Sequence, residues 1–166
     1  MNRQLSALAL ALLGACSTFD PTGTFTGDAT SITETRVYAG PPAADGSATV
    51  DTNRSQSTTA GARVIVRRTS ERQIEVDLGF CRLRVEHGED ELARSGLVTE
   101  GQVCNVEVGG RTEAMPVLSG NVDLPADGAS GLSIDLTGSL RRDVNGVPEG
   151  YFASWIWTFR GERTPE

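Results

Sequence analysis

Apolar and polar residues alternate along much of the chain after residue 23, at the two-residue period of half-buried β-strands. Threonine, serine, glycine and β-branched residues dominate, and no window of eleven residues follows the helical period of 3.6. We therefore predict an all-β fold, a single antiparallel meander of about eight strands over residues 24–166. Closure removes exposed sheet edges, so we expect a small closed β-barrel, with a β-sandwich as the alternative.

Turn signals predict four hairpins and one further turn whose register stays open. A turn at Gly79-Phe80 gives matching faces, because it pairs Val76 with Leu83 and Ile74 with Val85, and Asp77 with Arg82 and Glu75 with Arg84. Upstream, a short loop at 69–71 would pair Val66 with Ile74 and Val64 with Val76. A hairpin around 125–130 would pair Val122 with Ile134. Gly109-Gly110 also predicts a turn, but the residues after it give no clear register.

The last hairpin carries the strongest turn signal, Asn145-Gly146. Centred there, the pairing sets Leu140 opposite Tyr151 and Leu136 opposite Trp155. By contrast, residues 39–61 are small and polar, with Pro41-Pro42 and Asp45-Gly46, and predict a long loop with room for one short strand near residues 48–51.

Length and charge narrow the function. At 166 residues the chain forms one ordinary domain. All 15 basic residues are arginine, against 22 acidic residues, so the net charge of −7 repels phosphate backbones and makes nucleic acid an unexpected partner.

The first residues read as an export signal. Arg3 precedes an apolar stretch from Leu5 to Ala15 that is too short to span a bilayer. The sequence Leu13-Gly14-Ala15-Cys16 resembles the lipobox of bacterial lipoproteins. The resemblance implies a signal peptide at residues 1–15, lipidation of Cys16, and a short tether at 16–23 that holds the folded part close to a membrane. The residue after the cysteine is Ser17 rather than aspartate. In Gram-negative lipoproteins this resembles the default signal for sorting to the outer membrane. An ordinary cleaved signal peptide is the alternative.

Two cysteines remain after that signal, Cys81 and Cys104. An even number in an oxidising compartment predicts a disulfide, with a pair of buried thiols as the alternative. A zinc site is disfavoured because these cysteines lack the close ligand pairs that zinc sites use.

Catalytic constellations are missing from the sequence, so we do not expect an enzyme. His87 is the single histidine, and the acidic run that surrounds it lacks the spacing of a calcium loop, so we expect a solvated loop, no metal and no cofactor. There is no glycine-x-serine-x-glycine elbow. Glu75 and Asp77 have arginine partners, which argues against a pair of catalytic carboxylates.

Aromatic residues concentrate near the C-terminus, where Tyr151, Trp155, Trp157 and Phe159 share one strand face. They form either the floor of a ligand pocket or simply the core. Phe152 and Ile156 face the other way and form a candidate contact patch, unless the 39–61 loop covers them. Gly23-Thr24-Phe25 resembles the glycine-x-tryptophan of lipocalins, with phenylalanine in place of tryptophan, which implies a barrel with a ligand cup but supplies no functional residue.

Together these features predict a lipid-anchored envelope protein with two possible roles. The first is a non-catalytic binding module for a small apolar or glycan ligand or for a partner protein; the second is a structural or assembly lipoprotein of an envelope complex. An empty interior with a polar exterior would favour the first, and a filled interior with an exposed patch at Phe152 and Ile156 would favour the second.

Overall fold

The fold is all-β, as expected, and consists of antiparallel strands in one sheet. The computed structural model describes residues 20–87, 95–124 and 131–165, and within these ranges there are nine strands and no helix. The strands are β1 (Gly23–Tyr38), β2 (Val50–Arg68), β3 (Gln73–Asp77), β4 (Arg82–His87), β5 (Ser95–Val98), β6 (Val103–Val108), β7 (Arg111–Asp123), β8 (Gly131–Val144) and β9 (Val147–Arg163).

The sheet closes into a ring. Its order is β5-β4-β3-β2-β1-β9-β8-β7-β6, and an additional pairing of β5 with β7 joins the two sides. Eight strands therefore form the ring, while β6 pairs only with β7 along the described chain and lies beside the closure. This ring-like arrangement is the edge-removing closure expected from the sequence.

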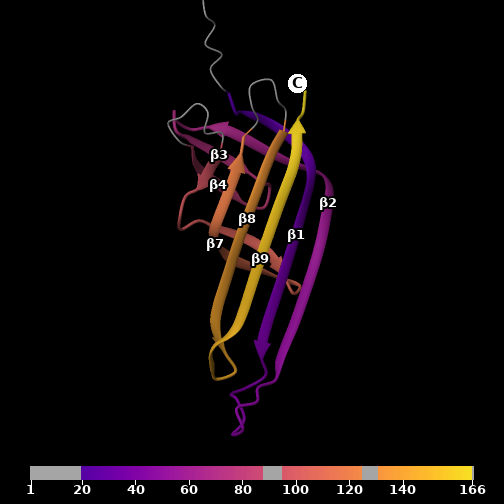
Figure 1. Ribbon diagram of the computed structural model, residues 1–166, viewed down its shortest axis with the longest axis vertical. Coiled ribbons are helices and arrows are strands. Elements are labelled where there is room, and N and C mark those ends of the chain that lie inside the picture. The colour runs from indigo at the N-terminus through magenta and orange to yellow at the C-terminus, as the bar shows by residue number, and fades with distance from the viewer. Residues whose placement is uncertain (1–19, 88–94, 125–130, 166) are drawn as a thin grey trace, which may run out of the picture.

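Strand lengths differ widely, and β1, β2, β8 and β9 are the longest, followed by β7 with 13 residues. β1, β2, β8 and β9 have 16, 19, 14 and 17 residues, whereas β3, β4, β5 and β6 have 4 to 6. At roughly 3.3 Å per residue, β1 extends over about 50 Å. Figure 1 shows the consequence: the long strands project past the shorter ones, which gather at one end of the molecule.

The molecule therefore has two distinct ends. At the proximal end lie residue 20, where the described chain begins, and the C-terminus; at the distal end lie the β1–β2 loop and the β8–β9 turn (Figure 1). We call the distal portion of the long strands, residues 34–38, 50–54, 139–144 and 147–154, the arm. The two ends are separated by about the length of β1.

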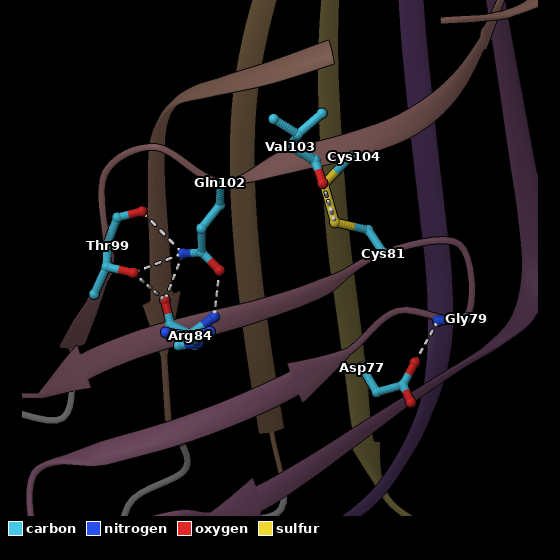
Figure 2. Close-up of a disulfide and its surroundings, with 8 residues drawn as sticks. All are labelled: Asp77, Gly79, Cys81, Arg84, Thr99, Gln102, Val103 and Cys104. Carbon is cyan, nitrogen blue, oxygen red and sulfur yellow. Dashed lines mark hydrogen bonds between the residues drawn. A yellow bond between two sulfur atoms is a disulfide. The ribbon is translucent and has the colours of Figure 1, made fainter. Parts of the chain in front are cut away.

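The core is built from inward-facing residues of nearly every strand. Phe25, Trp155 and Phe159 are among its largest fully buried side chains. A disulfide joins Cys81, in the β3–β4 turn, to Cys104 on β6, with an S–S distance of 2.05 Å (Figure 2). The covalent bond thus ties β6 to a neighbour with which it shares no strand pairing.

A second attachment guides the chain into β6. The side-chain amide of Gln102 accepts a hydrogen bond from the backbone N–H of Arg84 at 2.6 Å and donates to the carbonyl oxygens of Arg84 and Thr99, both at 2.9 Å (Figure 2). Gln102 therefore occupies the place of a strand partner on β4, and β6 begins at the next residue.

The β6–β7 hairpin covers the inner face of the long strands. Gly109, at its tip, lies beside Thr35 of β1, where an added Cβ would stand 3.8 Å from the threonine methyl. On β8, Gly138 allows the hairpin to approach closely, because a Cβ there would lie 2.6 Å from the carbonyl oxygen of Pro116. The hairpin turn itself, Gly109-Gly110, has positive φ at both residues and matches the expected turn.

Two of the expected registers are confirmed. Val76 pairs with Leu83 and Ile74 with Val85 across the Gly79-Phe80 turn. Val122 pairs with Ile134, although the connecting residues 125–130 lie outside the described chain.

Two other registers were wrong, each by two residues. Val66 pairs with Val76 rather than Ile74, because the β2–β3 turn is centred one residue later than expected, with the backbone N–H groups of Thr69 and Ser70 both donating to the carbonyl oxygen of Gln73. The Asn145-Gly146 turn is present, with φ of 52° and 75°, but an irregularity between Arg142 and Val144 sets Leu140 opposite Ala153 and Leu136 opposite Trp157. The inward and outward faces survive both shifts because a slip of two residues preserves the alternation.

The long loop expected at 39–61 was also wrong in extent. β2 begins at Val50, which pairs with Tyr38 at the end of β1, and the pairing continues through the arm. The loop therefore spans only residues 39–49. Residues 50–61 are exposed, which explains the missing alternation of apolar residues. Backbone hydrogen bonds to β1 hold this segment as a strand, up to an irregularity beside Gly61, whose φ is 68°.

We expect removal of the disulfide to lower the free energy of unfolding without changing the fold. Replacing both cysteines, Cys81→Ser with Cys104→Ser, frees a loop closed over a sequence separation of 23 residues, for which chain entropy predicts a loss of about 3 kcal/mol. Urea unfolding of the variant and of the parent protein, with and without reductant, measures it. In the chain that starts at Ser17, Cys81 and Cys104 are the two cysteines, so a free thiol detected in that chain when denatured and unreduced would contradict the bond.

Candidate functional site

The aromatic residues expected to line a pocket lie in the core. Tyr151, Trp155, Trp157 and Phe159 are 8, 1, 6 and 0% exposed. Phe80 packs edge-on against both tryptophans, and Trp157 stacks on Phe159 with ring centroids 6.1 Å apart. A ligand among these rings would have to displace packed side chains, so the pocket role stays a prediction while the core role is what their burial describes.

The expected contact patch lies on the outer face of β9. Ile156 is 46% exposed and pairs with Ile32 of β1. Phe152 is half-buried, and its cover comes from two guanidinium groups rather than from the 39–49 loop alone: Arg36 lies 5.9 Å and Arg141 5.5 Å from the ring centroid. Both arginines are cross-strand neighbours of Phe152, on β1 and β8.

Phe152 opens onto a hollow at the distal end. This distal hollow has a volume of about 440 Å³ and draws its walls from β1, the β1–β2 loop, β8 and β9. Its lining residues are Arg36, Tyr38, Pro42, Arg141, Val147, Pro148, Glu149 and Phe152. Aromatic, proline and aliphatic surfaces thus meet two arginines in one depression.

Ion pairs neutralise both arginines of the distal hollow. Arg36 lies 2.6 Å from Glu34, and Arg141 lies 2.9 Å from Glu149. Because a guanidinium has five N–H donors, each arginine keeps donors that its carboxylate does not use. The hollow is therefore nearly neutral and suits an apolar or aromatic segment that presents hydrogen-bond acceptors, more than a strongly charged ligand.

Turn geometry fixes the walls of the hollow. Asn145 donates a hydrogen bond from Nδ2 to the carbonyl oxygen of Tyr38 at 2.8 Å, which ties the β8–β9 turn to the end of β1. Glu149 has a φ of 50°, and its backbone N–H donates to Oδ1 of Asp143 at 2.8 Å. These contacts hold Pro148 and Glu149 in place across the irregularity in the β8–β9 pairing.

An ion pair between a buried carboxylate and a partly exposed arginine fastens the β6–β7 hairpin beneath the arm. Glu113 on β7 accepts two hydrogen bonds from the guanidinium of Arg142, at 3.0 and 2.8 Å, and one from the hydroxyl of Tyr151 at 3.1 Å. Arg142 also covers the Tyr151 ring, at 4.1 Å from its centroid. Burial and the neighbouring Glu113 carboxylate raise the pKa of the Tyr151 hydroxyl, so it stays protonated as the donor.

Other expected sites are placed as follows. Cys16, the signal peptide and most of the tether lie outside the described residues. His87 is the last residue of β4. The acidic residues that follow it, from residue 88 to residue 94, lie outside the described chain. Within residues 20–87, 95–124 and 131–165, no three histidine, cysteine or acidic side chains gather as metal ligands would.

No protein-family model, curated protein or solved structure matches this chain. The functional argument therefore depends on the geometry of the chain itself.

We expect Glu113→Ala to loosen the hairpin. The substitution leaves the Tyr151 hydroxyl and the Arg142 guanidinium without their acceptor. The Arg142 side chain is 45% exposed and regains contact with water. We therefore expect the free energy of unfolding to fall by about 2 kcal/mol, less than for a fully buried pair. Glu107→Ala, at an exposed site on the same hairpin, is the control and should cost under about 0.5 kcal/mol. Equal losses in chemical unfolding of the two variants would contradict this role for Glu113.

Proposed function

We propose that this protein is a non-catalytic, lipid-anchored assembly protein of the bacterial cell envelope, which holds a partner protein at its distal hollow. The observation that carries the proposal is that the molecule has two opposite ends. The described chain starts at the proximal end, while the Phe152 hollow lies at the distal end, about the length of β1, roughly 50 Å, away. A lipid on Cys16, four residues before Asp20, would put the membrane at the proximal end and direct the arm away from it.

The packing of the aromatic residues favours assembly over capture of a small ligand. A cup for an apolar ligand or a glycan needs exposed aromatic surface, and Trp155 and Phe159 are almost completely buried. On the outer face of β9, Ile156 is exposed and Phe152 is half-buried beneath two guanidiniums. Aromatic and arginine side chains are the types that most often anchor protein interfaces, and Phe152 with its two arginines combines them.

The anchoring proposal is supported by the lipobox-like sequence at Cys16, and Ser17 favours the outer membrane. The described part of the chain contains no helix with the length and hydropathy to cross a bilayer. The disulfide-bonded cysteine pair also fits an oxidising envelope compartment.

Cys16→Ser tests the anchor. The substitution removes the thiol that would carry the lipid, so we expect loss of fatty-acid labelling and release of the protein from the membrane fraction. Ser17→Ala, beside the acylation site, keeps the thiol and should remain labelled. Labelling that persists in Cys16→Ser, or a parent protein that carries no fatty acid, would refute lipidation at this residue.

A photoreactive phenylalanine analogue at position 152 tests the partner site. In intact cells we expect one discrete crosslinked product, while the same analogue at Leu118, which is 66% exposed on β7, should give none. Phe152→Ala should weaken recovery of that partner by about ten-fold, the effect of removing an interface anchor. Identical crosslinking at positions 118 and 152 would argue against the distal hollow as the contact.

A further inference from the structure

A second hollow lies at the proximal end, where β1 begins and β9 ends. This proximal hollow has a volume of about 740 Å³. Its lining residues are Asp20, Thr22, Gly23, Thr24, Thr26, Arg63, Arg163, Thr164 and Pro165. Hydroxyl groups and two arginines dominate the lining, in contrast to the aromatic and proline surfaces of the distal hollow.

Neither arginine of the proximal hollow is ion-paired with a carboxylate of the described chain, although both are held in place. Arg163 donates from Nη2 to the backbone carbonyl oxygen of Asp20 at 2.9 Å, and its guanidinium lies 5.4 Å from the centroid of the Phe25 ring. Arg63 donates to the hydroxyl of Thr24 at 3.5 Å. Both guanidiniums are exposed and keep several N–H donors free.

One carboxylate, that of Asp20, belongs to the lining. Its Oδ1 accepts a hydrogen bond from the backbone N–H of Thr22 at 3.0 Å, and this bond, with smaller contributions from Arg68 and Arg163, holds its pKa below the ordinary value. Two guanidiniums against one ionised aspartate leave the hollow with a net positive charge. The hydroxyls of Thr26 and Thr164, 2.9 Å apart, add donors to the same wall.

From this geometry we propose that the proximal hollow binds the phosphate groups of anionic lipid headgroups in the membrane that carries the anchor. Guanidinium groups recognise phosphate oxygens through paired N–H donors, and threonine hydroxyls complete such contacts. The assignment rests on the proposed anchoring at Cys16. Four residues of extended chain reach at most about 14 Å, so a lipidated Cys16 would hold Asp20, and with it the hollow, within reach of the headgroups.

The overall charge of −7 does not oppose this contact. At about 0.1 M ionic strength the field of a charge is screened over roughly 10 Å. The arm does not carry this negative charge, because its four arginines match its four acidic residues. Glu162 pairs with Thr26 and is an acidic neighbour of the hollow, but it forms no ion pair with Arg63 or Arg163 in the described chain. The N–H donors that these two guanidiniums keep free therefore make the contact with a phosphate.

The test uses a chain that starts at Ser17, which contains all nine strands and both bonded cysteines but lacks the anchor. Co-sedimentation is measured with vesicles of about one-third phosphatidylglycerol in phosphatidylcholine, and with phosphatidylcholine alone. We expect binding only to the anionic vesicles, weakened about five-fold by Arg63→Gln or Arg163→Gln and roughly 25-fold by the double variant. Arg54→Gln removes the same charge from an exposed site on the arm and should leave binding unchanged.

The outcomes separate the alternatives. Equal weakening by Arg54→Gln would show a general charge effect and overturn the site, as would absence of binding to anionic vesicles. Calorimetry with inorganic phosphate identifies the source: arginine-dependent phosphate binding without vesicle binding would overturn the membrane assignment in favour of a free phosphate. Fatty-acid labelling of Cys16 in the full chain is scored separately, so the anchor and the headgroup site can fail independently.

Discussion

The shape of this protein depends on how the inner face of its long strands is covered. β1, β2, β8 and β9 extend beyond the short strands that close the ring. Strand pairing closes the proximal half, where β3, β4 and β5 complete the circle, but these short strands cannot follow β1, β2, β8 and β9 into the arm. Tyr151 and Ala153 of β9 still face inward there and are buried. The β6–β7 hairpin supplies their cover, which explains why β6 leaves the ring order and pairs with β7 alone.

Two attachments hold that cover, and they differ in kind. The disulfide fixes the base of the hairpin at Cys104, and the ion pair of Glu113 with Arg142 fixes its middle. A buried carboxylate is costly unless it is paired with a cation and hydrogen-bonded, and Glu113 receives three hydrogen bonds, two of them from Arg142. This requirement selects one position of the hairpin along the arm, because a slip would leave the carboxylate unpaired. Apolar contacts alone, being non-directional, would tolerate small slips.

Alternation and turn chemistry made much of this fold predictable from sequence. The face on which each side chain lies was predictable, because a one-residue slip would move every buried side chain to the solvent face. A two-residue slip keeps the apolar residues on the same face, so the sequence pattern does not distinguish it. Both errors in register were slips of two residues. The irregularity near Glu149 depends on a positive φ at a non-glycine residue, which no sequence rule specifies. Residues 50–61 gave no strand signal because they bury nothing, and their pairing with β1 is a matter of backbone hydrogen bonds.

The same errors hid part of the candidate site. Phe152 could be singled out from its outward parity, but the expected register would have put Ser139 beside it, two residues from its actual neighbour Arg141. The hollow requires the correct pairing, together with Pro42 from a loop whose path no period predicts. Glu113 was equally hidden, since an acidic residue at an inward position contradicts the expected pattern until its partners on β8 and β9 are known.

Elongation changes how the charge of the molecule should be read. In a compact domain about 30 Å across, the charged groups of different faces lie closer together, and a net charge of −7 would repel anions from most directions. Here the two ends are separated by about five screening lengths, so each end presents its own charge. Each arginine of the distal hollow is paired with a glutamate, whereas the lining of the proximal hollow contains Arg63, Arg163 and one carboxylate, that of Asp20. Glu162 lies next to that lining, paired with Thr26. The net charge alone therefore does not describe either end, and a small anionic group at the proximal end is physically compatible with an acidic protein.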